Sequence, residues 1–96
     1  MFRSFDYRNI TFKQDPQGEG LVISGDITNK SGKNYHSVVF RVILFIKSTP
    51  IGNTTITING FANNQTKRFE KQMGELQYKK VAPEITYHEI YPESAY

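Results

Sequence analysis

A chain of 96 residues has room for one hydrophobic core, so we expect a single domain over residues 1–96. The 38% of hydrophobic and 14% of aromatic residues argue against a disordered chain, and the absence of Cys excludes disulfides, thiolate metal sites and a thiol nucleophile. The net charge of +3 is spread along the sequence, which does not favour nucleic-acid binding.

Membrane insertion of this sequence is not expected. Its longest apolar run, residues 38–46, contains Arg41 and is much shorter than the roughly 20 residues that a membrane-spanning helix needs. The first 14 residues carry charged or polar groups throughout and lack the apolar core of a secretory signal. Neither feature identifies a compartment.

Alternation of apolar and polar residues between turn-forming segments predicts an all-β fold. The first strand is expected at residues 7–13, and the Pro- and Gly-containing stretch 15–20 predicts a tight turn. A second strand at 21–28 points Leu21, Ile23 and Ile27 inward. Gly25 falls on the same face, where we expect either a β-bulge or a large neighbouring side chain packed over it.

The polar segment 29–34 predicts a turn before the longest strand, residues 38–46. Both faces of this strand are mostly apolar. One face is expected to line the core, and it comprises Val38, Phe40, Val42, Leu44 and Ile46. The other carries Val39, Arg41, Ile43 and Phe45, and it needs cover from the C-terminal segment, a bent loop or another molecule.

The second half of the chain predicts three further strands. We expect them at residues 53–59, after a turn at 48–52, then at 66–73, and finally at 84–91. The many charges in 66–73 place that strand at a surface. Residues 74–81 are ambiguous, and the chain ends near 1–5 and 92–96 are expected to fray.

The order of these features resembles the FxLYD-type small β-sandwich domains of bacteria and archaea. The resemblance covers about residues 21–73 and rests on four segments, namely Gly25-Asp26-Ile27-Thr28-Asn29, Phe40-Arg41-Val42-Ile43-Leu44-Phe45, Pro50-Ile51-Gly52 and Gln65-Thr66-Lys67-Arg68-Phe69. Ile46 and Lys47 stand where the pattern places an Asp, and Asn63 and Asn64 where it often has Pro-Gly.

The resemblance implies an immunoglobulin-like antiparallel β-sandwich, for which we expect about six to seven strands. It also implies a domain commonly found outside the cytoplasm, in lipoproteins or membrane-anchored proteins, with no established activity. The matched segments encode turns and core positions, so they name no functional site.

No catalytic or metal-binding pattern is present, so we expect no enzyme and no cofactor. The two histidines, His36 and His88, lie far apart in the sequence, and His88 and Glu89 point to opposite faces of a strand. No phosphate-binding Gly loop or calcium loop occurs. Four Asn-x-Ser/Thr sequences begin at Asn9, Asn29, Asn53 and Asn64, a pattern that Asn- and Thr-rich turns also produce without glycosylation.

Two surfaces follow as hypotheses. A non-catalytic module could bind a protein partner, or a second copy of itself, through Val39, Ile43, Phe45, Tyr87 and Tyr91, unless the two tyrosines pack into the sandwich. The alternative is a small barrel that binds nucleic acid or another polyanion. Its residues, Lys67, Arg68, Lys71, Lys79 and Lys80, would have to converge on one face.

Overall fold

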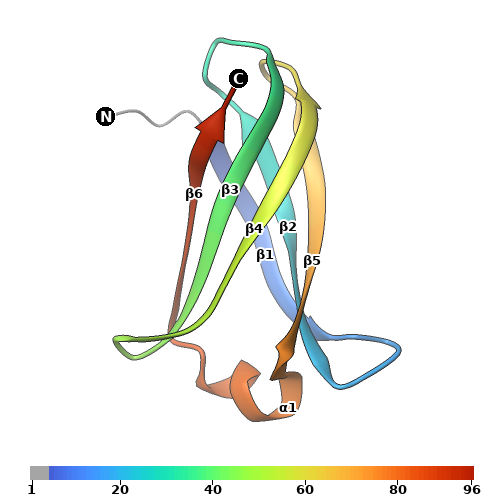
Figure 1. Cartoon of the computed structure of the whole chain (residues 1–96), viewed down its shortest axis with the longest axis vertical. Coiled ribbons are helices and arrows are strands. Elements are labelled where there is room, and N and C mark those ends of the chain that lie inside the picture. Colours follow the sequence, from blue (N-terminus) through green and yellow to red (C-terminus); the bar gives the residue numbers. More distant parts are fainter. Residues whose placement is uncertain (1–4) are drawn as a thin grey trace.

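The computed structural model describes residues 5–96, which form six strands and two short helical turns (Figure 1). The elements are β1 (Phe5–Gln14), β2 (Gly20–Asn29), β3 (Tyr35–Ile46), β4 (Thr49–Phe61), β5 (Thr66–Gln77), α1 (Tyr78–Val81), a 3₁₀ turn (Ala82–Glu84) and β6 (Tyr87–Ala95). Every strand pairing is antiparallel.

The strands form two three-stranded sheets with the orders β1-β2-β5 and β4-β3-β6. Figure 1 shows the two sheets as layers, with α1 at the end opposite the C-terminus. The prediction of an all-β antiparallel sandwich is therefore confirmed, with six strands. These orders match strands A-B-E and C′-C-F of immunoglobulin-like sandwiches.

Phe40 lies at the centre of the core between the sheets. Its side chain is fully buried, and its ring centroid lies 5.0 Å from that of Phe5, 6.0 Å from that of Tyr7 and 6.4 Å from that of Phe61. All three pairs meet edge to face, as the aromatic quadrupole favours. The inward positions predicted for residues 21–28 and 38–46 are buried, except that Ile46 is half-buried.

Gly25 faces the core as predicted, with large side chains packed over it. A Cβ atom at this position would overlap Ile10 Cδ1 and would lie 3.1 Å from Phe69 Cε2. The missing side chain thus leaves room for Ile10 of β1 and Phe69 of β5 to pack over β2.

The predicted turn at residues 48–52 is wrong. The chain reverses at Lys47 and Ser48, and β4 starts at Thr49, so Pro50 and Gly52 lie within a strand. Lys47 has φ 57°, which a non-Gly residue adopts infrequently, and this explains why the sequence did not reveal the turn.

Residues 92–96, where fraying is expected, take part in strand pairing. Strand β6 runs through Pro92 to Ala95, and Tyr96 exchanges two backbone hydrogen bonds with Ser37, at 3.0 and 3.1 Å. At the other end, Phe5 is buried within β1, and residues 1–4 lie outside the described part of the chain. No helix within residues 5–96 is long and apolar enough to cross a membrane.

Candidate functional site

The outer face of the β4-β3-β6 sheet brings together the five residues predicted for the interaction surface. Antiparallel residues directly opposite each other share a face, and Phe45 pairs with Tyr87 while Arg41 pairs with Tyr91. Val39 and Ile43 follow at alternate positions of β3. No strand or helix of residues 5–96 lies across this face, which we call the outer β3 face (Figure 1).

Tyr87 and Tyr91 do not pack between the sheets. Their exposed fractions are 55% and 43%, whereas Val39, Ile43 and Phe45 are half-buried by their neighbours on the same sheet. The Phe45 and Tyr87 ring centroids lie 5.5 Å apart. The C-terminal strand therefore flanks β3 and extends the apolar face sideways, but it does not cover it.

Arg41 occupies the middle of the outer β3 face. Its Nε donates to Glu93 Oε1 at 2.6 Å, Nη2 donates to Glu93 Oε2 at 2.9 Å, and Nη1 donates to Asn53 Oδ1 at 2.7 Å. The hydrogen bond from Arg41 lowers the pKa of the Glu93 carboxyl. Because this charge is paired and its donors are oriented, the face presents aromatic and aliphatic groups around a neutralised centre.

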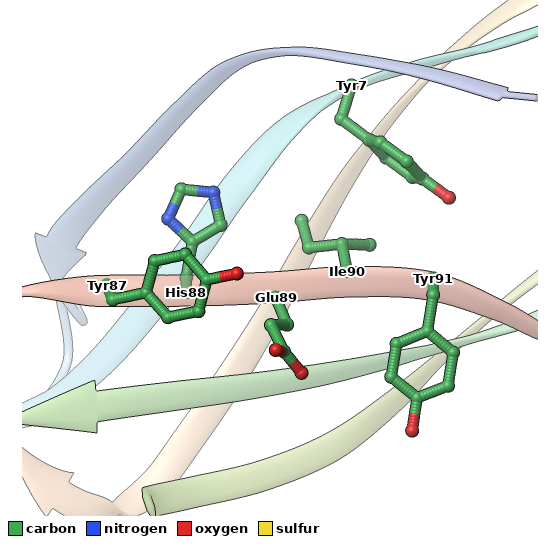
Figure 2. A pocket seen from close by; sticks show the side chains of 6 residues that line it. All are labelled: Tyr7, Tyr87, His88, Glu89, Ile90 and Tyr91. Carbon is green, nitrogen blue, oxygen red and sulfur yellow. The ribbon is translucent and has the colours of Figure 1, made fainter. Parts of the chain in front are cut away.

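A groove of about 420 Å³ runs along the edge of β6 that faces away from β3 (Figure 2). Figure 2 shows His88 and Ile90 pointing from β6 toward β1, while Glu89 and Tyr91 point to the opposite side and the Tyr87 ring lies over the β6 ribbon. Tyr7 reaches into the same region from β1. The groove therefore joins the outer β3 face to the open side of the sandwich between β1 and β6.

The buried Tyr7 hydroxyl and the half-buried His88 line this side of the sandwich. The Tyr7 hydroxyl is buried and makes no hydrogen bond within residues 5–96, and burial raises its pKa. His88 lies edge-on to Phe12, with ring centroids 6.2 Å apart, and burial lowers its pKa below the ordinary value. Within residues 5–96, no charged side chain is paired with either group.

We expect His88 to make stability depend on pH. Its lowered pKa in the folded state means that the unfolded chain binds more protons, so stability is full above pH about 6.5 and declines as pH falls, levelling off below the folded-state pKa. His88→Gln should remove this part of the decline. Urea denaturation of both proteins at several pH values checks it, and identical slopes between about pH 5 and 7 would contradict it.

The two histidines lie apart in the structure. His88 lies opposite Leu44, whereas His36 lies at the far end of β3 and is exposed. Within residues 5–96, no three His, Asp or Glu side chains form a group that could hold a metal ion.

The five basic residues of the alternative surface do not share a face. Arg68 lies on the outer face of the β1-β2-β5 sheet, 3.4 Å from Asp26, while Lys67 lies on the other side of β5 and donates to Asn59 O at 3.1 Å. Lys71 lies on the same side as Lys67. Lys79 and Lys80 belong to α1, at the end of the sandwich. The geometric condition for a polyanion surface is therefore not met.

Sequence reasoning missed the pairing of Arg41 with Glu93 and the contribution of Tyr7 to the groove. A lone Arg in an apolar strand was a signal that a carboxylate would lie nearby, but 52 positions separate the two partners. Among the Asn-x-Ser/Thr sequences, Asn29 is fully buried and so cannot accept a glycan in the folded state, whereas the other three Asn residues are exposed.

Comparisons with protein-family models, curated proteins and solved structures found no significant match. The residues that carry the FxLYD resemblance have structural roles here. Gly25 lies against Phe69, and the Asn29 side chain bonds the neighbouring turns. The resemblance thus stays a prediction.

Proposed function

We propose that this protein is a non-catalytic interaction module that binds a protein partner through the outer β3 face. The observation that carries the proposal is the gathering of Val39, Ile43, Phe45, Tyr87 and Tyr91 on one sheet face that no described element covers. Aromatic side chains are enriched at protein interfaces because they bury much area at a small entropic cost. The resemblance adds a cell envelope as the proposed location.

The shape of the face fits a macromolecular partner better than a small ligand. A small-molecule site is concave, with a few polar groups that converge on the ligand. Here the polar groups at the centre, Arg41, Glu93 and Asn53, are already bonded to one another. A partner would therefore contact mainly the rings and aliphatic side chains, with the paired charges within or beside the contact.

Site-specific photo-crosslinking tests this proposal. A benzophenone amino acid placed at Tyr91 on the outer β3 face should crosslink a defined partner protein in the cells that produce this chain. The same group at Thr11, on the outer face of the other sheet, is the matched control. A second substitution, Ile43→Lys, should abolish the Tyr91 crosslink without changing the unfolding transition.

Equal crosslinking from Tyr91 and Thr11, or a crosslink that survives Ile43→Lys, would reject the outer β3 face as the binding surface. Salt-sensitive binding of the purified protein to a polyanion such as heparin, lost on substitution of the five basic residues, would instead support the alternative function.

A further inference from the structure

The outer edge of β6 presents unpaired backbone groups. An antiparallel strand alternates the direction of its backbone N–H and C=O groups, and Tyr96 exchanges bonds with Ser37, so odd-numbered residues of β3 bond toward β6. The register then turns the backbone groups of Tyr87, Glu89 and Tyr91 toward β3. Those of His88 and Ile90 consequently face away from the sheet, where no strand of residues 5–96 pairs with them.

The strand order places this edge where immunoglobulin-like sandwiches have a further strand. In immunoglobulin-like sandwiches the sheet that contains C′, C and F continues with strand G, which pairs antiparallel with F. Strand β6 holds the F position, and within residues 5–96 no strand holds the G position. An added strand beside β6 would therefore extend this sheet to the four strands that the architecture accommodates.

The edge strands β1 and β5 of the other sheet carry features that hinder pairing. Strand β1 is interrupted by a register shift at Asn9, which has φ 57°. The edge of β5 bears Lys67 and Lys71, and Lys67 donates a hydrogen bond to Asn59 O of β4, in the other sheet. Bulges and edge lysines are the devices that keep strands from pairing with other chains. Residues 87–91 of β6 contain neither.

Side chains along the β6 edge define what a partner strand would carry. Glu89 lies on the outer side between Tyr87 and Tyr91, and it has no ion pair or hydrogen bond within residues 5–96. On the inner side, Ile90 and His88 lie next to Tyr7 in the groove. A cation opposite Glu89 would meet a carboxylate flanked by two aromatic rings, and apolar side chains would complete the inner side.

We propose that the outer edge of β6 binds an extended segment of a partner protein as an additional antiparallel strand, with a basic residue opposite Glu89 between two apolar residues opposite His88 and Ile90. This goes beyond the proposed function, because main-chain pairing at the edge is separate from docking on the outer β3 face. Pro92, which lacks an N–H, and the bulge at Glu93 limit the paired segment to about five residues.

The probe is the seven-residue peptide Ser-Thr-Val-Lys-Val-Thr-Ser with blocked ends, titrated into the ¹⁵N-labelled protein. We expect the largest chemical-shift changes at the amides of His88 and Ile90, whose N–H groups would gain acceptors, and slower hydrogen exchange at both. Shifts confined to Phe45 and its neighbours on the outer β3 face would overturn edge binding while agreeing with the proposed function.

Two N-methylated peptides separate strand pairing from side-chain contact. In the proposed register the two Val N–H groups point toward β6 and the Lys N–H points away. Methylation of both Val nitrogens should abolish binding, whereas methylation of the Lys nitrogen, with the same side chains, should leave it unchanged. Equal effects of the two modifications would overturn the proposal.

A charge exchange tests the position of Glu89. Glu89→Lys should weaken binding of the Lys peptide about fivefold and should strengthen binding of the peptide with Glu in place of Lys by a similar factor. Glu75→Lys, an exposed site in β5, is the control with the same change in net charge and should leave the preference between the peptides unchanged. If the amides of His88 and Ile90 shift with protein concentration alone, a second copy occupies the edge and the proposal is wrong.

Discussion

Phe40→Ala should lower the free energy of unfolding by about 3–5 kcal/mol. Phe40 is fully buried, and its ring meets those of Phe5, Tyr7 and Phe61, which belong to both sheets. These neighbours are fixed by strand pairing, so they cannot collapse far into the space that the ring leaves. Urea denaturation of the variant measures the effect as a lower midpoint with an unchanged m-value.

Tyr7→Phe is the matched control for this experiment. It keeps the ring that packs 6.0 Å from Phe40 and removes a buried hydroxyl that has no hydrogen bond within residues 5–96. We expect stability to stay the same or to rise by about 1 kcal/mol, because an unpaired buried hydroxyl is costly. A loss on Tyr7→Phe comparable to that of Phe40→Ala would mean that the hydroxyl has a partner.

Asn29→Asp should cost about 2–4 kcal/mol despite its nearly identical shape. The buried Asn29 Nδ2 donates to Lys33 O at 2.9 Å and to Phe61 O at 3.1 Å, and its Oδ1 accepts from Ser31. A carboxylate still accepts from Ser31 but donates to neither carbonyl oxygen. It would also place a negatively charged oxygen next to the carbonyl oxygens of Lys33 and Phe61 in a buried position.

Asn63→Asp provides the control for the same chemical change. Asn63 uses its Oδ1 to accept from the Gly32 N–H at 2.9 Å, a role that a carboxylate keeps. Thermal or urea unfolding of both variants should show a large loss for Asn29→Asp and a change of no more than about 0.5 kcal/mol for Asn63→Asp. Similar losses would indicate that charge in this group of turns, and not the lost donors at Asn29, determines the effect.

The strands at the centre of each sheet could be predicted from the sequence because burial leaves a strong pattern there. In β3 the inward residues form an unbroken apolar series, and in β2 the alternation around Gly25 also proved correct. Central strands bury both edges and at least one face, so their sequences must satisfy the pattern along most of their length.

Edge strands were predicted less accurately because they are partly exposed to solvent, so their sequences need not follow the apolar pattern that burial requires. The last strand was expected to end at residue 91, before Pro92. In an edge strand, however, a Pro residue can turn its missing N–H away from the sheet, and β6 continues to Ala95. The expected strand at 84–91 started too early, because residues 82–84 form a 3₁₀ turn after α1. The four-residue helix α1 spans about one turn, which is too short for a helical repeat of apolar residues to be recognised in the sequence.

The sequence predicted which β3 residues of the candidate site share a face, but not which strand lies beside β3. Alternation placed Val39, Ile43 and Phe45 on one side of β3, and the structure confirms that placement. Which strand would lie beside β3 could not be derived, because β6 pairs with it across two intervening strands. The exposure of Tyr87 and Tyr91 depends on that pairing.

The order β4-β3-β6 has a consequence for biosynthesis. Strand β3 is the most apolar segment of the chain, and β4, which follows it directly, occupies one of its edges as soon as the hairpin forms. The other edge has no partner until β6 has been translated, some 40 residues later by the pairing of Phe45 with Tyr87. A nascent chain that pauses before β6 would expose an unpaired apolar strand, which is the kind of segment that general chaperones bind and that promotes aggregation when they are absent.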